Sequence, residues 1–254
     1  MKNKLEGSCC LSVVIPAYNE EATLASVVDE VLKLPEVLEV IVVDDGSTDG
    51  TRQICEDLCR LPKVRAIYQP RNGGKCEALK AGFAVSTGEI VIVQDADLEY
   101  DPSEIPEVIR PILEGQADVV YGSRFLVRRS ARVLYFYHYL ANKSLTLFSN
   151  LLTNVNFTDV ETGYKAFRGD IIRNMVITSK GFGIEIEVTA KIAKLGCAIY
   201  EVPISYHGRT YEQGKKIGFS DGLMALWYIV KFNLFCSLAA SYLRLPATDA
   251  APKH

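Results

Sequence analysis

The triplet Asp95-Ala96-Asp97, at the end of an apolar run, is the strongest chemical signal in this 254-residue chain. Two carboxylates one residue apart at the end of a buried strand repel each other unless a cation neutralises them. Mg²⁺ and Mn²⁺ prefer oxygen ligands and leave positions open for substrate phosphates. We therefore expect Asp95 and Asp97 to hold Mg²⁺ or Mn²⁺, with Glu99 as a further candidate ligand. An isolated motif of this kind also occurs in turns whose aspartates bond nearby backbone, so both interpretations stay open.

Two other polar clusters suit a nucleotide. Asp44 and Asp45 precede a Gly-Ser pair and could bond a base or a ribose, or lie at a helix N-terminus, where aspartates suit the dipole. Residues 71–75 (Arg-Asn-Gly-Gly-Lys) combine a turn, a cation and a helix start, which suits a phosphate. The spacing is not that of a Walker A loop. Lys75 therefore binds phosphate or lies on a solvated face.

Basic and polar residues of the C-terminal half form a second group of candidates. Arg124 ends an apolar run, and an arginine fork matches phosphate geometry. His138 and Asn142 are four residues apart and would share one helix face. A glycine-containing basic loop, which could close over a site, carries Arg209, Lys215 and Lys216.

The elements that must position these groups alternate between strand and helix. Short apolar runs predict strands at residues 11–15, 40–43, 64–68, 90–93, 118–121 and 199–202. Helical spacing of apolar residues predicts helices between the first five. This alternation implies a mainly parallel sheet with helices on both faces. Ligands of such sheets bind beyond the carboxyl ends of the strands, which is where the acidic clusters fall.

Longer helices are expected after residue 123. Residues 134–152 and 223–243 are strongly apolar, and the second run is long enough to span a bilayer. Lys231 and Asn233 make a span unfavourable, so we expect a packed or interfacial helix. Residues 102–254 carry 18 Lys and Arg against 13 Asp and Glu, a balance that could attract phosphates or an anionic membrane surface.

Composition sets the broad class. The chain is 48% hydrophobic and 23% charged, with a net charge of −3, which excludes a disordered or collagen-like protein. Seven cysteines without paired spacing and the lack of a signal-peptide pattern predict a reducing, cytoplasmic location. The expected organisation is an N-terminal extension (1–10), a main domain (11–220), an amphipathic, possibly membrane-associated helix (221–245) and a disordered tail (246–254).

Three motifs in order carry a family resemblance. Residues 13–21 (VVIPAYNEE), residues 43–51 (VDDGSTDGT) and the acidic triplet resemble family 2 glycosyltransferases of GT-A fold. Residues 122–125 (GSRF) and 201–205 (EVPIS) are similar to the dolichol-phosphate mannose synthase, or polyprenyl-phosphate glycosyltransferase, branch. The resemblance covers residues 11–220. It implies an α/β, Rossmann-like, mainly parallel sheet flanked by helices, with amphipathic helices at the C-terminus.

The resemblance implies a role for each matching residue. The nucleotide-sugar site would comprise Pro16, Tyr18, Glu20, Asp45, Lys75, Asp95, Ala96, Lys215 and Lys216, and the metal site Asp95, Asp97 and Glu99. Arg124, His138 and Asn142 would bind the acceptor phosphate, although basic and hydroxyl residues are usual in that branch near the position of His138. Asp97, Arg124 and Arg209 would be catalytic, with Arg209 on a mobile loop over the donor.

The activity implied is an inverting, metal-dependent transfer from a nucleotide-diphosphate sugar, with GDP-mannose as the first choice, to a polyprenyl or dolichyl phosphate. Because the acceptor phosphate is already an anion, no general base is needed. The enzyme would lie peripherally at the cytoplasmic face of a membrane and bind no nucleic acid.

Three alternatives remain. The donor could be UDP-glucose or a UDP-N-acetylhexosamine. The acceptor could be a glycan hydroxyl, which would require Asp159 or Glu161 as a base. A non-catalytic nucleotide-sugar-binding protein is disfavoured because the Asp95/Asp97 pair is present.

Overall fold

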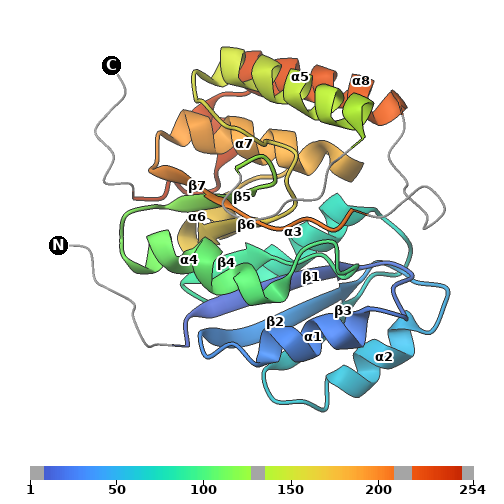
Figure 1. The fold of residues 1–254 in the computed structure, drawn as a ribbon. Helices are drawn as coiled ribbons and strands as arrows, with labels where there is room; N and C mark the ends of the chain where they lie inside the picture. The colour runs from blue at the N-terminus through green and yellow to red at the C-terminus, as the bar shows by residue number, and fades with distance from the viewer. Residues whose placement is uncertain (1–8, 127–134, 209–218, 248–254) are drawn as a thin grey trace.

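The structure, a computed structural model, describes residues 9–126, 135–208 and 219–247. Its centre is a seven-stranded sheet with the order β3-β2-β1-β4-β6-β5-β7 (Figure 1). The strands are β1 (Leu11–Ala17), β2 (Val37–Asp44), β3 (Val64–Tyr68), β4 (Ile90–Val93), β5 (Val119–Ser123), β6 (Lys165–Arg168) and β7 (Ile199–Pro203). All six predicted strands are present, and the α/β class is confirmed.

The sheet is mixed rather than wholly parallel. β1, β2, β3 and β4 pair in parallel, as do β5 and β7. β6 runs antiparallel between β4 and β5, with Ala166 opposite both Ile92 and Val120. The sequence analysis missed β6 because its four residues, Lys-Ala-Phe-Arg, lack a continuous aliphatic run. This strand joins the two halves of the sheet.

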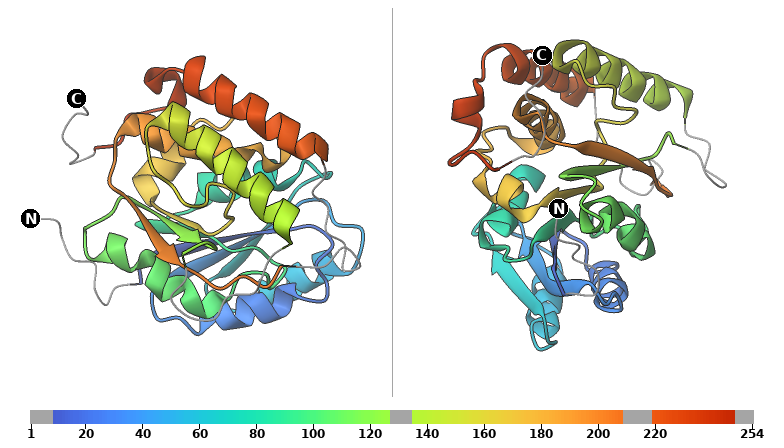
Figure 2. Two further views of the ribbon diagram at one scale, coloured as in Figure 1. Left: turned by 45° about the horizontal axis from the view of Figure 1, so that its top comes forward. Right: turned by 90° about the vertical axis from the view of Figure 1, so that its left-hand side faces the viewer.

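Helices cover both faces of the sheet (Figures 1 and 2). The helices are α1 (Leu24–Leu32), α2 (Thr51–Leu58), α3 (Lys75–Val85), α4 (Ile105–Leu113), α5 (Phe136–Thr153), α6 (Gly169–Asn174), α7 (Ile184–Leu195), α8 (Phe219–Leu234) and α9 (Leu238–Ser241), with 3₁₀ turns η1 (Pro102–Glu104) and η2 (Gly181–Gly183). α1, α2 and α4 pack on one face and α3, α6 and α7 on the other. This is the two-sided burial expected of a largely parallel sheet.

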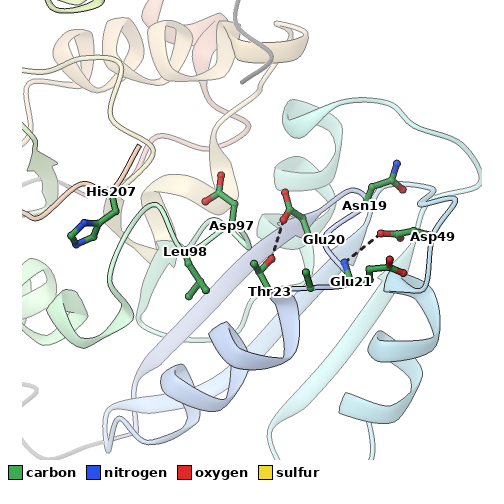
Figure 3. A pocket seen from close by; sticks show the side chains of 9 residues that line it. Asn19, Glu20, Glu21, Thr23, Asp49, Asp97, Leu98 and His207 are labelled. Carbon is green, nitrogen blue, oxygen red and sulfur yellow. Dashed lines mark hydrogen bonds between the residues drawn. The ribbon is translucent and has the colours of Figure 1, made fainter. Parts of the chain in front are cut away.

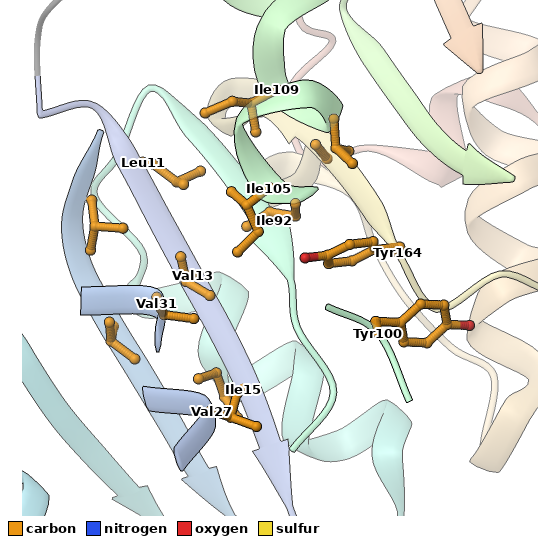
Figure 4. Packing of buried hydrophobic residues seen from close by; sticks show 14 of the residues in the cluster. Leu11, Val13, Ile15, Val27, Val31, Ile92, Tyr100, Ile105, Ile109 and Tyr164 are labelled. Atoms are coloured by element: carbon orange, nitrogen blue, oxygen red, sulfur yellow. The ribbon is translucent and has the colours of Figure 1, made fainter. Parts of the chain in front are cut away.

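The alternation of side chains along β1 explains the two cores. Val13 and Ile15 point toward α1, with Ile15 beside Val27 (Figure 4), and Val14 belongs to the opposite core with residues of α3. All four are fully buried. Because successive strand residues face opposite sides, an unbroken apolar strand requires cover on both faces.

The C-terminal helices form an outer layer. α5 and α8 pack on each other and on α7, on the side away from α1 and α2 (Figure 2). The predicted helix at 223–243 is wrong in its extent, because α8 ends at Leu234 and α9 begins after Ser237. Three hydrogen bonds stabilise the break. The Ser237 hydroxyl accepts from Ala240 N at 3.2 Å, and Lys194 Nζ donates to the carbonyl oxygens of Phe232 and Cys236. Within the described residues, no helix has the length and apolarity needed to cross a membrane.

Candidate active site

An open pocket of about 590 Å³ lies beyond the carboxyl ends of the strands. Its size is within the range of small-molecule sites. Figure 3 shows Asp97 and Leu98, on the turn after β4, between His207 and the segment from Glu20 to Thr23. The lining residues are Asn19, Glu20, Glu21, Ala22, Thr23, Asp49, Asp97, Leu98 and His207. Asp97 and Glu20, which the sequence analysis selected, both line the pocket at this edge, as does Asp49, which it did not select.

Hydrogen bonds join the loop after β1 to the loop after β2. Asn19 has a left-handed φ of 57°, which asparagine tolerates better than most residues. Its backbone N–H donates to Ser47 Oγ at 3.1 Å, and its side-chain oxygen accepts from Thr48 N at 2.9 Å. Glu20 N donates to Thr51 Oγ1 at 2.8 Å, and Glu20 Oε2 accepts from Thr23 Oγ1 at 2.9 Å. These contacts hold the predicted nucleoside residues Tyr18 and Glu20 on a rigid edge, with Pro16 inside β1.

Asp45 organises the loop that precedes α3. It is 2% exposed, and its two carboxylate oxygens accept from Gly73 N at 3.0 Å and Gly74 N at 2.7 Å. Burial raises the pKa of Asp45, although these two N–H groups act in the opposite direction. Gly74 has a φ of 85°, which glycine adopts without strain. Asp45 therefore brings the start of α3, and with it Lys75, toward the acidic turn after β4.

Lys75 joins two carboxylates across the site. Its ammonium lies 2.8 Å from Asp95 Oδ1, 3.0 Å from Asp95 Oδ2 and 3.5 Å from Glu185 Oε1. Burial by itself lowers the pKa of Lys75, but the Asp95 and Glu185 carboxylates outweigh it, and the pKa lies above its usual range. Lys75 is therefore a charged group of the site, which excludes a position on a solvated face.

The turn after β4 presents Asp97 to the pocket. Asp97 Oδ1 accepts from Glu99 N at 3.2 Å, and Leu98 between them has a φ of 58°. A left-handed branched aliphatic residue is strained, and such strain concentrates at functional sites. Glu99 Oε2 accepts from Tyr206 Oη at 3.0 Å and Glu99 O from His207 N at 2.9 Å. Glu99 thus ties the segment after β7 to this turn, while Ala96 is 3% exposed and packs in the core.

The carboxylates of this turn suit a divalent cation that also binds phosphate. Among the described residues, no group of three or more His, Cys, Asp or Glu side chains is arranged so that the protein alone could hold a metal ion. Mg²⁺ and related hard cations, however, are commonly held by one or two carboxylates plus substrate phosphates. Asp97 lines the pocket, whereas Asp95 already faces the Lys75 ammonium. The carboxylates present therefore fit such a cation, which Asp97 would hold together with substrate phosphates.

Arg124 is held by a buried carboxylate. Its Nε and Nη2 donate to Asp159 at 2.7 and 2.8 Å, and its backbone N–H donates to the same carboxylate at 3.1 Å. The side chains are 10% and 0% exposed. The guanidinium also lies 5.1 Å from the Tyr206 ring centroid. The bidentate pair therefore connects the end of β5 to the segment before β6, and the Tyr206 contact adds the segment that carries His207.

The helical acceptor candidates lie on α5. His138 and Asn142 lie on one face of this helix, as predicted. The Asn142 side chain bonds within the helix, because its Nδ2 donates to the backbone oxygen of His138 at 2.9 Å. Lys143, which the sequence analysis did not select, lies 4.6 Å above the Phe125 ring and donates to Thr158 O at 3.2 Å. It is the α5 cation that reaches the Arg124 region. Arg209, Lys215 and Lys216 lie outside the described residues.

The sequence analysis missed several residues near the site, among them Asp49 in the pocket wall. His207 lines the pocket, Lys143 approaches Phe125 and Glu185 approaches Lys75. The position of His207, directly before the polar loop that follows β7, was an available signal. Glu185 and Lys143 lie on helices whose packing is not readable from local sequence.

Comparisons with known proteins agree with the motif order. The family model for Glycosyl transferase family 2 matches residues 12–175. The polyprenol monophosphomannose synthase of Mycolicibacterium smegmatis is 29% identical over 214 residues, which is 81% of this chain and 80% of that protein. The undecaprenyl-phosphate mannosyltransferase of Micrococcus luteus is 30% identical over 212 residues, 81% of this chain and 86% of that protein.

A solved structure shares the fold. Glucosyl-3-phosphoglycerate synthase from Mycobacterium tuberculosis, crystallised with Mn²⁺, uridine diphosphate and phosphoglyceric acid, superposes with a TM-score of 0.70 at 24% identity, over 89% of this chain and 78% of that one. The GT-A fold expected from the sequence is confirmed.

Proposed function

Because the chain belongs to glycosyl transferase family 2, we propose that it transfers a hexose from a nucleotide-diphosphate sugar to the phosphate of a polyprenyl lipid. The observation that carries the proposal is the match over four-fifths of the chain to two relatives named for polyprenol and undecaprenyl-phosphate mannose transfer. The pocket beside Asp97 supplies the place where such chemistry would occur. The same names support mannose as the sugar, and we propose GDP-mannose as its donor.

The site residues divide between donor and acceptor. We assign the nucleoside to the edge formed by Pro16, Tyr18 and Glu20, with Asp45 positioning the loop before α3 beside it. We assign the diphosphate to Asp95, Asp97 and Lys75, on a turn that Glu99 braces and Ala96 anchors in the core. A divalent cation, Mg²⁺ or Mn²⁺, would neutralise the negative charge that develops on the leaving diphosphate. Lys75 adds a fixed positive charge at Asp95. Arg209 with Lys215 or Lys216 would complete the charge over the donor.

The acceptor phosphate needs orientation rather than deprotonation. We assign its positioning to Arg124 and the α5 face that carries His138 and Asn142, because a correctly aimed phosphate oxygen attacks the anomeric carbon directly. A glycan hydroxyl would instead require a base. Asp159 is poorly suited to that role, since both of its oxygens are engaged by Arg124. This contact argues against Asp159 as the base and leaves Glu161, whose Oε1 has no hydrogen-bond partner among the described residues, as the base that a hydroxyl acceptor would need.

A donor and acceptor panel tests the proposal. Purified protein is assayed with Mn²⁺ or Mg²⁺, with GDP-mannose, UDP-glucose or UDP-N-acetylglucosamine, and with a short polyprenyl phosphate or a soluble glycan. We expect GDP-mannose with polyprenyl phosphate to give the highest kcat/KM, because the relatives are mannose transferases. Transfer to soluble glycans with none to polyprenyl phosphate would contradict the acceptor assignment.

The outer helices offer a surface for peripheral membrane contact. Large apolar side chains are exposed on α5 and α8, among them Phe136 (67%), Tyr137 (82%), Leu151 (71%) and Trp227 (57%). Aromatic residues favour the membrane–water interface. We propose that this surface rests on the lipid that carries the acceptor. A cytoplasmic face is supported by the seven free thiols, all in described segments.

Single substitutions on this surface should weaken lipid binding. We expect Trp227→Ser or Tyr137→Ser to lower partitioning onto phosphatidylglycerol-containing vesicles about tenfold, because membrane binding scales with buried apolar area. Sedimentation with vesicles measures the effect. Leu61→Ser is the matched control, since Leu61 is an exposed apolar residue (38%) near the end of α2, on the far side of the molecule (Figure 1). Equal losses in all three variants would contradict a specific lipid-facing surface.

A further inference from the structure

Two buried carboxyl oxygens next to the Lys75–Asp95 pair have no hydrogen-bond partner among the described residues. They are Glu185 Oε2, in the first turn of α7, and Glu161 Oε1, in the segment before β6. Glu185 is only 7% exposed. Buried acceptors are nearly always satisfied in folded proteins, because an unpaired one loses its hydration without compensation. Two such oxygens beside one site indicate groups that a ligand completes.

Glu185 is linked to Asp95 through Lys75, and Glu161 is a neighbour of Glu185 in a segment whose backbone packs against Asp95. Lys75 Nζ lies 2.8 Å from Asp95 Oδ1 and 3.5 Å from Glu185 Oε1, so one ammonium bridges the two carboxylates. Gly163, two residues after Glu161, lies so close that a Cβ there would be 2.7 Å from Asp95 Oδ2. The backbone of the Glu161 segment therefore closes directly on Asp95.

The charges around the two oxygens suit neutral hydroxyl groups better than a second metal ion. Lys75 faces Glu185, and Lys165 lies nearby, donating to Val160 O at 3.0 Å and to Thr162 O. Burial and then the neighbouring Glu185 carboxylate raise the pKa of Glu161, and burial lowers the pKa of Lys165. The ammonium groups of Lys75 and Lys165 offset part of the negative charge of these carboxyls, whereas one acceptor oxygen on each glutamate has no hydrogen-bond partner among the described residues.

We propose that Glu185 and Glu161 form the hexose subsite of the enzyme, where their unpaired oxygens accept hydrogen bonds from hydroxyl groups of the transferred sugar. This inference rests on the proposed function, because it takes the donor diphosphate to lie at Asp95 and Asp97. A site built to bond a hydroxyl discriminates strongly against an analogue that lacks it, since its buried acceptors are then left unpaired. The subsite would therefore determine which sugar is transferred.

A binding experiment separates the sugar from the nucleotide. Affinities for GDP and for GDP-mannose are measured by calorimetry with Mn²⁺ for the parent protein, Glu185→Gln and Glu39→Gln. Glu39 is the matched control, a carboxylate on β2 that accepts from Ser12 Oγ at 2.6 Å, remote from the carboxyl ends of the strands. We expect Glu185→Gln to weaken GDP-mannose about tenfold or more and GDP by less than twofold. Glu39→Gln should change neither.

A deoxy-sugar series tests the subsite without any substitution. Donors lacking one hydroxyl at a time are assayed with the parent protein, and we expect at least one deoxygenation to lower kcat/KM by about 10- to 100-fold. The same deoxygenation should cost little in Glu185→Gln or Glu161→Gln, because the partner of that hydroxyl is already changed. If UDP-glucose proves the better donor, the UDP series replaces the GDP series.

Several results would overturn the subsite. One is tolerance of every single deoxygenation within twofold by the parent protein, which decides the matter even if Glu185→Gln does not fold. Another is an equal loss of GDP and GDP-mannose affinity in the variant, which indicates a structural role. A changed Mn²⁺ affinity without nucleotide would indicate a metal site instead.

Different results would contradict the proposed function without contradicting the sugar subsite. If the parent protein binds no nucleotide sugar, the enzyme assignment to these donors is wrong. If it binds one but transfers to another acceptor, only the lipid assignment is wrong, and the sugar-binding comparison still tests the two glutamates.

Discussion

Asp97→Asn is expected to abolish sugar transfer, lowering kcat by about 10³-fold or more, while the protein stays folded. Asp97 lines the pocket on the strained turn after β4, and a neutral amide there would hold a divalent cation weakly. Loss of several kcal/mol of charge stabilisation on a leaving diphosphate corresponds to about three powers of ten in rate. Initial rates at saturating Mn²⁺ and thermal unfolding of the same sample measure the two effects.

The control for Asp97→Asn is a substitution at a nearby carboxylate whose role is structural. Asp101 caps η1, where its side chain accepts from Ser103 N at 2.9 Å. Asp101→Asn should therefore keep most of the activity and lose only a small part of the stability. Chelation of divalent cations should reproduce the Asp97→Asn defect in the parent protein. Full activity of Asp97→Asn, or no response to chelator, would contradict the role assigned to this turn.

The second large effect is on stability. Asp159→Asn should lower the free energy of unfolding by about 3–5 kcal/mol, because it leaves the buried Arg124 guanidinium without its counter-ion. Both carboxylate oxygens of Asp159 accept from Arg124, and the Asp159 side chain is 0% exposed. Urea unfolding measures the loss.

A more exposed pair supplies the control for Asp159. Arg168 and Asp170 are joined at 2.7 Å, but their side chains are 28% and 40% exposed. Asp170→Asn should cost less than about 1 kcal/mol, as exposed pairs usually do. Equal losses in the two variants would mean that burial does not determine the strength of the Arg124–Asp159 pair. Arg124→Lys should also destabilise, because a lysine cannot reproduce the two-point contact.

Strand positions were predictable because buried parallel strands are continuous apolar runs. Residues 90–93 (Ile-Val-Ile-Val) are a clear case, and the structure has β4 at those bounds. β6 was not predictable in this way, since its pattern is short and bordered by Lys165 and Arg168. The break between α8 and α9 was also missed, because it depends on Lys194, a residue of α7 that binds carbonyl groups at the break.

The location of the candidate site was predictable from the sequence, but the contacts between its side chains were not. The carboxyl-end rule places Asp45, Asp95 and Asp97 at one edge of the sheet, and they lie there. The bond between Tyr206 and Glu99 joins residues 107 positions apart. The Lys75–Glu185 contact likewise connects distant segments. Such contacts follow from packing of whole elements, which local spacing does not encode.

The most direct measurement is the position of Mn²⁺ in crystals grown with the nucleoside diphosphate of the preferred donor. Anomalous scattering locates the ion independently of any activity assay. We expect one strong peak between the Asp97 carboxylate and the diphosphate oxygens, on the turn after β4. An ion bound elsewhere, or nucleotide bound with Asp97 directed away from its phosphates, would contradict a cation-assisted transfer at this turn.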